Sequence, residues 1–224
     1  MVPPEQRAEP DLGQLLGGRR GALDATVPVI AFVVGLTVAQ AVGGTPPVAW
    51  ASGAAMLAAL VLGVVRMIGG RPPRAVAVGL LGVAVAAVVA LYTGRAVDFF
   101  LIQIVANAVS AMVWAVSILV RWPLLGVVVG AALGQRTRWR RDPDLVRGYQ
   151  RASWAWVGQY VLRLAVFLPL YLADAVVALG VARLLLTWPL VALCIAAAWP
   201  LVRSALPPDH PGLLHPGGRG MPPA

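Results

Sequence analysis

The sequence contains no lysine, and it has only one cysteine and two histidines among 224 residues. A single cysteine, Cys194, excludes an intramolecular disulfide and a cysteine-rich metal cluster. The missing lysine excludes a phosphate-binding loop of the kind in which lysine follows a run of glycines. No spacing of acids, histidines or hydroxyl groups forms a nucleophile–base pair, so we expect a non-enzymatic protein without cofactor or metal.

Charge is also scarce, at 12% of residues, whereas 59% of residues are hydrophobic and the mean hydropathy is +0.80. Soluble globular domains carry about 25% charged residues. A transmembrane helix needs about 20 predominantly apolar residues, and several uncharged runs approach that length. The composition therefore predicts an all-α fold, a polytopic transmembrane helical bundle.

The apolar runs predict six spans, or five spans plus a re-entrant or interfacial helix. We expect the spans at about residues 26–42, 48–65, 75–92, 99–120, 154–173 and 176–202. The extra segment, 123–134, has only 12 residues and is too short to cross alone. As domains we expect one transmembrane domain, 24–203, between two disordered cytoplasmic tails, 1–23 and 204–224, which are rich in proline and glycine.

Two helix starts carry capping signals. Asp24 offers an N-cap side chain, with Pro28 still in the first turn. Asp142, Pro143 and Asp144 supply a cap, a proline at the first helical position and an acid at the positive end of the helix dipole. We therefore expect the first span to begin near Asp24, and one long helix to begin near Pro143.

The arginines are distributed unevenly over the predicted loops. Cytoplasmic loops retain arginine and lysine, and a cytoplasmic N-terminus places 15 of the 18 arginines on that side. Only Arg95 then lies in an outer loop, while Arg163 and Arg183 lie within or at the edge of spans. This bias predicts a multi-pass protein of the plasma membrane with both termini cytoplasmic. The alternative, a signal peptide cleaved near residues 39–41, is opposed by Pro28 and by the acids upstream.

Polar residues inside two spans form the candidate functional site. Gln103, Asn107 and Ser110 share one face of the fourth span, and Gln159 and Arg163 share one face of the fifth. A basic side chain at mid-helix costs about 2.5 to 3.5 kcal/mol, so it normally faces protein or water. We expect these residues either to join helices through hydrogen bonds or to line a wet path, in which Arg163 holds a protein acceptor or a transported anion.

Two further groups are structural candidates. Asp174 and Arg183, nine residues apart, are a candidate ion pair at the outer edge of the membrane. Gly126, Gly130 and Gly134 form a row spaced by four residues, which lets helices pack closely within or between protomers. Chance spacing in a glycine-rich chain is the alternative for this row.

The segment between the short helix and the long helix is crowded with arginine. Near an anionic leaflet each basic residue is worth about 1 kcal/mol, so we expect contact with a bilayer of anionic head groups. The residues are Arg136, Arg138, Arg140, Arg141, Arg147 and Arg151. No basic motif stands apart from the membrane segments, so we expect no nucleic acid as partner. A homo-oligomer or an envelope protein partner is the remaining expectation.

Four stretches carry a resemblance to a known family. They are "GGRRGALDATVPVIAFVVG" at 17–35, "GRAVDFFLIQIVANAV" at 94–109, "LVRWPLLGVVVG" at 119–130 and "WRRDPDLVRGYQRASWAW" at 139–156. Over about residues 17–202 the chain resembles an actinobacterial family of integral membrane proteins known only as a domain of unknown function. That resemblance implies no established activity.

A looser similarity is to the intracellular septation protein A family of inner-membrane proteins. It rests on the opening of the first span from Asp24 to Pro28 and on the glycine-bearing segment from Arg121 to Gly134. This similarity implies a role in envelope integrity and division.

The "RGALD" and "GRAVD" segments, at 20–24 and 94–98, each precede three spans and also fit an inverted repeat, an architecture found in many transporters.

Two functions therefore compete. The first is a non-enzymatic integral membrane protein of the cell envelope, with a scaffold or envelope-biogenesis role. The alternative is a permease for a small solute such as an anion, with a polar path around Arg163.

Overall fold

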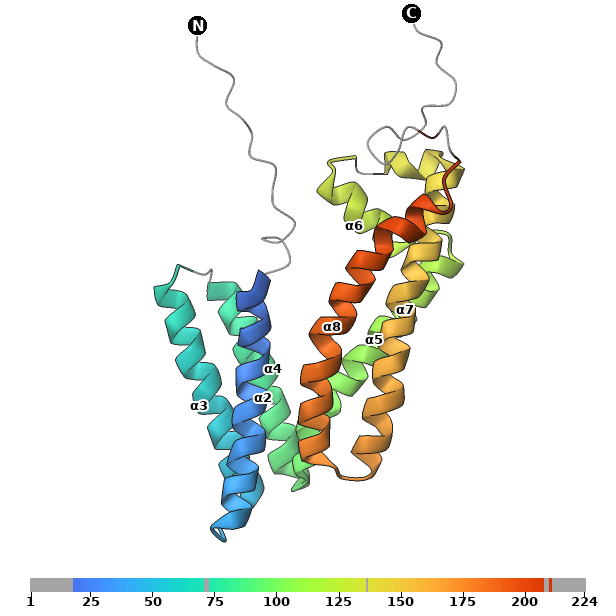
Figure 1. Ribbon diagram of the computed structural model, residues 1–224. Coiled ribbons are helices and arrows are strands. Elements are labelled where there is room, and N and C mark those ends of the chain that lie inside the picture. Colours follow the sequence, from blue (N-terminus) through green and yellow to red (C-terminus); the bar gives the residue numbers. More distant parts are fainter. Residues whose placement is uncertain (1–17, 71–72, 136, 208–209, 211–224) are drawn as a thin grey trace, which may run out of the picture. The chain divides into compact units, whose positions relative to one another are not determined.

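The structure is a computed structural model that describes residues 18–70, 73–135, 137–207 and 210 (Figure 1). In this part of the chain, five helices are long and apolar enough to cross a membrane, and the apolar stretch Thr26–Ala41 is shorter. The regular elements are all helical. The chain is therefore a multi-pass membrane protein built as a polytopic helical bundle, which confirms the predicted fold class.

The helices follow the predicted spans closely. They are α2 (Gly18–Ala41), α3 (Pro47–Ile68), α4 (Pro73–Thr93), η1 (Ala96–Phe100), α5 (Leu101–Leu119), α6 (Leu124–Ala132), η2 (Arg138–Arg141), α7 (Pro143–Leu172) and α8 (Val176–Arg203). The short α6 has nine residues, or about 14 Å of helix, which confirms that this segment does not cross a bilayer alone.

The first helix begins earlier than the sequence predicts. α2 starts at Gly18, six residues before Asp24, so Pro28 lies inside the helix and not in its first turn. Arginine, alanine and leucine between these positions favour helix strongly enough to extend it past the cap signal. The predicted disordered tail 1–23 is therefore wrong for residues 18–23, and residues 1–17 lie outside the described residues.

The start of the long helix confirms the prediction. Asp142 Oδ1 accepts hydrogen bonds from the backbone amides of Asp144 and Leu145, at 3.0 and 3.3 Å, and Pro143 is the first helical residue. The cap satisfies two of the N–H groups that a helix start leaves without partners.

The helices form two compact units. Unit 1 spans residues 1–100 and 174–180, and in it α2 packs on α3 and α3 packs on α4 (Figure 1). The Phe32 ring stacks on Phe99 with 3.9 Å between centroids, and Phe100 meets Phe32 edge-on at 6.3 Å. Apart from residues 174–180, the boundary falls two residues after the "GRAVD" segment. The inverted repeat and the single transmembrane domain both stay predictions.

Unit 2 spans residues 101–173 and 181–224 and contains α5, α6, η2, α7 and most of α8. α5 packs on α7, and α6 and η2 pack around the first turns of α7. Trp139, Leu145 and Tyr149, all 0% exposed, form the centre of a hydrophobic cluster at this end of the unit. α8 contacts α7 at several levels, including a bond from Cys194 Sγ to the carbonyl oxygen of Ala155 at 3.4 Å.

Candidate functional site

Arg163 is buried between α7 and α8, with only 4% of its surface exposed. Its Nη2 donates to Gln159 Oε1 at 3.1 Å, one turn earlier on α7, and to the backbone carbonyl oxygen of Thr187 on α8 at 2.8 Å. Its guanidinium also lies 5.6 Å from the ring centroid of Tyr160. The structure therefore brings two of the predicted site residues, Gln159 and Arg163, into direct contact.

Several donors around this contact have no acceptor. Because Gln159 Oε1 accepts from Arg163, the free end of that amide is its Nε2 donor. On these helices, the buried polar atoms that lack a hydrogen-bond partner within the described residues include Asn107 Nδ2, Trp156 Nε1, Gln159 Nε2, Arg163 Nε and Thr187 Oγ1. Four of them are N–H donors, and a buried donor left unpaired costs about 1 to 3 kcal/mol. The site is therefore rich in donors and short of acceptors.

Two contacts fix how α5 lies along α7. Gln150 Nε2 donates to the Ile118 carbonyl oxygen at 3.1 Å, and the Trp114 and Trp156 rings stack with centroids 5.1 Å apart. As the residue number rises on α7 it falls on α5, so the two helices are antiparallel. This register brings the polar faces of the two helices to the same levels.

Asn107 and Arg163 lie at one depth in this register. Asn107 comes seven residues before Trp114, and Arg163 comes seven residues after Trp156. Seven residues are nearly two helical turns, so each step returns to the same face and covers about 10 Å in the same direction. Asn107, which is 1% exposed, is therefore level with Arg163 on the neighbouring helix.

The other two predicted residues of α5 extend this face. Ser110 is half-buried and level with Gln159, and Gln103 is half-buried and level with Phe167. Neither side chain forms a hydrogen bond within the described part of the chain. The predicted polar residues thus form a continuous strip along the α5–α7 contact.

The charge of Arg163 has no acidic partner in the described part of unit 2. Asp142 and Asp144 are the acids there, and Asp144 is 19 residues, or about 28 Å, away along α7. Asp174, the next acid along the chain, pairs with Arg95. A buried cation with unpaired donors around it favours a negatively charged or acceptor-rich group as its complement.

Asp174, which the sequence predicts to pair with Arg183, pairs with Arg95 within unit 1. Asp174 Oδ1 lies 2.7 Å from Arg95 Nη2, and Asp98 Oδ1 lies 3.9 Å from Arg95 Nη1. Arg183 is half-buried and forms no ion pair with the described acids. Asp174 belongs to unit 1 and Arg183 to unit 2, so the pair between them stays a prediction.

The glycine row splits into different roles. A Cβ atom on Gly126 would lie 2.8 Å from the Trp139 ring, so this glycine makes room for a buried indole. Gly130 is buried in α6. Gly134 lies beyond the helix with φ of +66°, a left-handed conformation that glycine adopts without strain. Gly126 therefore packs closely against a side chain, and the close approach of two helices along this row stays a prediction.

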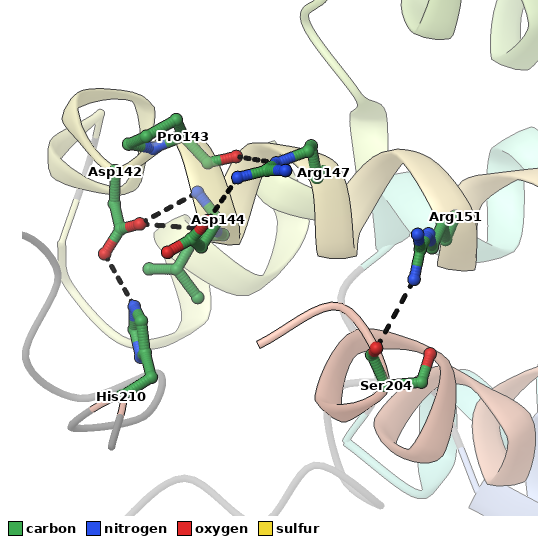
Figure 2. Close-up of polar contacts among 8 residues, drawn as sticks. Asp142, Pro143, Asp144, Arg147, Arg151, Ser204 and His210 are labelled. Carbon is green, nitrogen blue, oxygen red and sulfur yellow. Dashed lines mark hydrogen bonds and ion pairs between the residues drawn. The ribbon is translucent and has the colours of Figure 1, made fainter. Parts of the chain in front are cut away.

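The arginine segment also divides. Arg147 pairs with Asp144, and Arg151 donates to the carbonyl oxygen of Ser204 at 3.3 Å (Figure 2). Within the described residues, the side chains of Arg138, Arg140 and Arg141 have no hydrogen-bond acceptor, and Arg136 lies outside that part. Of the six predicted residues, Arg147 is therefore the one whose charge an acid compensates within the described part of the chain.

His210, expected to have no partner in a disordered tail, is bound to the start of α7. Its Nε2 lies 2.8 Å from Asp142 Oδ2 (Figure 2), and its side chain is 2% exposed. One ligand atom each from His210, Asp142 and Asp144 lies within 4.8 Å of the others, a spacing that a metal ion also requires. Asp142 already caps α7 and Asp144 already pairs with Arg147, so we assign the cluster a structural role in holding this segment.

Sequence reasoning missed three contributors. Thr187 supplies an acceptor through its backbone, which carries no side-chain signal. Trp122 contacts Arg140 across 18 residues, and His210 contacts Asp142 across 68. Helical periodicity reports which residues share a face, but it does not report which distant segment meets that face.

Comparisons with known proteins agree with this architecture. No curated protein and no solved structure matches the chain. One family model, described as "Protein of unknown function (DUF3159)", matches residues 16–209, a range that includes every helix from α2 to α8. The chain therefore belongs to the DUF3159 family of membrane proteins of unknown function.

Proposed function

We propose that this protein is a permease for a small anion, which binds at Arg163 between α5, α7 and α8. One observation carries the proposal: the Nε atom of the buried Arg163 guanidinium and three further buried N–H donors lack acceptors, and no described acid of unit 2 compensates the charge. An anion would supply both the missing charge and the missing acceptors.

The position of Arg163 supports binding inside the bilayer. It lies nine residues before the end of α7, or about 13 Å, which is close to half of a hydrocarbon core of about 30 Å. A cation at this depth is costly, and intramembrane ionisable residues commonly mark the paths of ions or substrates. The half-buried Gln103 and Ser110 extend the polar strip along α5 on either side of Asn107.

Permeation requires that binding be weak enough for release. The two bonds that Arg163 makes within the protein, to Gln159 and to the Thr187 carbonyl, hold the guanidinium when no anion is bound. Arg163 Nε and Gln159 Nε2 then remain available for the solute. The arrangement supports a site of moderate affinity.

An envelope scaffold is the second candidate. The same two bonds of Arg163 favour it, because they join α7 to α8 without any solute. This proposal adopts the similarity to the intracellular septation protein A family and an actinobacterial origin. It also places the protein in the plasma membrane with both termini in the cytoplasm. In a scaffold the strip between α5 and α7 would be dry and would serve only to pack the helices.

Anion flux into proteoliposomes tests the permease. Full-length protein is reconstituted, and uptake of radiolabelled formate and nitrate is compared with uptake into protein-free vesicles. Arg163→Gln should reduce uptake about tenfold or more, since a hydrogen bond to a charged group contributes about 1.5 to 3 kcal/mol. Arg183→Gln is the matched control, because it removes an arginine from α8 that pairs with no described acid. No uptake by the unmodified protein, or equal uptake by both variants, contradicts the proposal for these anions.

Thiol labelling separates the two candidates independently. Cys194→Ala removes the single native thiol, and Gln103→Cys, Asn107→Cys or Ser110→Cys then places one thiol on the polar strip. Val105→Cys, on an exposed position of α5, is the control. Labelling of the strip by a membrane-impermeant reagent in sealed vesicles supports a wet path. Complete protection in folded protein supports the scaffold.

A further inference from the structure

Arg140 is held in a fixed orientation by a tryptophan. Its guanidinium carbon lies 3.7 Å from the centroid of the Trp122 ring, a contact between η2 and the residues that follow α5. Stacking of this kind uses the face of the guanidinium and leaves the N–H groups at its edge available. No acceptor among the described residues contacts those N–H groups.

The turn that carries Arg140 is anchored from within. Trp139, the preceding residue, is 0% exposed and packs against Gly126, where any side chain would collide with its ring. The Trp139 ring also meets Tyr149 edge-on with centroids 5.5 Å apart. Because Trp139 is buried, its exposed neighbours Arg138 and Arg140 project from the surface of unit 2.

The acids next to this turn do not neutralise the charge of its arginines. Asp142 is 6% exposed, caps α7 and contacts His210, while Asp144 is 9% exposed and pairs with Arg147. Both carboxylates therefore already have partners (Figure 2). Arg138, Arg140 and Arg141 remain as three exposed cations without an acceptor within the described residues.

The surroundings of Arg140 match the boundary between lipid and water. Trp122, which is 41% exposed, lies three residues beyond the end of a membrane-spanning helix, where tryptophan commonly lies at head-group level. The adjacent α6 is too short to cross and exposes Val127 and Val128, which suits a helix at the interface. A ligand of Arg140 would therefore lie beside lipid head groups.

We propose that Arg140, oriented by Trp122 and flanked by Arg138 and Arg141, binds the phosphate of an anionic lipid head group. This site is distinct from the intramembrane site of Arg163 and does not depend on transport. A stacked guanidinium offers two parallel N–H groups, which match two phosphate oxygens. The flanking arginines add charge that selects an anionic lipid over a zwitterionic one.

Lipid binding to the purified full-length protein tests the site. Phosphatidylglycerol or phosphatidylcholine is titrated into protein in neutral detergent, and bound lipid is counted by native mass spectrometry. The variants are Arg140→Gln and Trp122→Leu, which keeps an apolar side chain but removes the ring. Arg147→Gln is the matched control, because it removes a charge that Asp144 already compensates.

We expect phosphatidylglycerol to bind more tightly than phosphatidylcholine. Arg140→Gln should weaken phosphatidylglycerol binding about fivefold, from about 1 kcal/mol per basic residue. Trp122→Leu should weaken it as well although the net charge is unchanged, and Arg147→Gln should not. If Arg140→Gln does not fold, Arg140→Lys keeps the charge, loses the paired N–H groups and should still weaken binding.

Three outcomes overturn the proposal. Equal binding of the two lipids to the unmodified protein means that no anionic head group is selected. Equal loss in Arg140→Gln and Arg147→Gln means that net charge alone attracts lipid. Inorganic phosphate that binds as tightly as phosphatidylglycerol, and is lost in Arg140→Gln, means that the ligand is free phosphate and not lipid.

Discussion

The indole rings of Trp114 and Trp156 stack with centroids 5.1 Å apart and planes within 6° of parallel. This contact joins the C-terminal third of α5 to the middle of α7 and sets the register in which Asn107 lies level with Arg163. Trp156 also presents an unpaired Nε1 donor on the face of α7 that carries Gln159. The aromatic pair therefore aligns α5 with α7, and Trp156 adds one donor to the donor-rich site.

A double-mutant cycle on these tryptophans should reveal their coupling. Trp114→Ala, Trp156→Ala and the double variant are unfolded in denaturing detergent, with exposure of the buried Cys194 thiol as the readout. The free energies of unfolding should deviate from additivity by about 0.5 to 1.5 kcal/mol, because aromatic pairs contribute that much beyond buried area. Additive losses would show that the rings touch without stabilising the register.

Gly126→Ala should destabilise the protein by about 1 to 3 kcal/mol, because the new methyl group would lie 2.8 Å from the buried Trp139 ring. Gly158→Ala is the matched control, since nothing lies within 4 Å of its Cβ position in α7. That control should stabilise the helix by up to about 1 kcal/mol. The free energy of unfolding is measured for both, and a neutral Gly126→Ala would contradict the tight contact.

Asp142→Ala should lower the free energy of unfolding by about 1 kcal/mol, since it removes the acceptor for the amides of Asp144 and Leu145. Asp142→Asn keeps a capping oxygen and should retain most of the stability. Hydrogen exchange of those two amides locates the effect. Equal exchange in the two variants would mean that the carboxylate stabilises the protein through its contact with His210 and not through the helix cap.

Asp174→Asn should change the free energy of unfolding by less than about 1 kcal/mol. The Arg95–Asp174 pair is solvent-exposed, and exposed pairs contribute about 0 to 1 kcal/mol. Asp174 has φ of +51°, a conformation that asparagine also tolerates. Asp174→Val, in contrast, should lower the free energy of unfolding by about 1 to 2 kcal/mol more, because valine is strained in this conformation. Similar stabilities for the two variants would contradict the conformational effect.

The membrane-spanning fold was readable from local patterns. The lengths of the apolar runs located the spans, and Asp142–Pro143 marked the start of α7 correctly. The start of α2 was wrong because a cap signal is weaker than several helix-favouring residues before it. Helical spacing also identified the face that carries Gln159 and Arg163. The bond from Arg163 to the Thr187 carbonyl oxygen could not be predicted, because the acceptor is a backbone atom.

The sequence by itself determined that the chain spans a membrane, because hydropathy and run length are properties of each segment alone. The tertiary structure decided which distant side chains meet: Asp174 pairs with Arg95, Asp142 contacts His210, and Arg140 stacks on the face of Trp122. These pairings depend on loops and helix ends that packing brings together. Residue spacing along one helix carries no information about a partner that arrives from elsewhere in the chain.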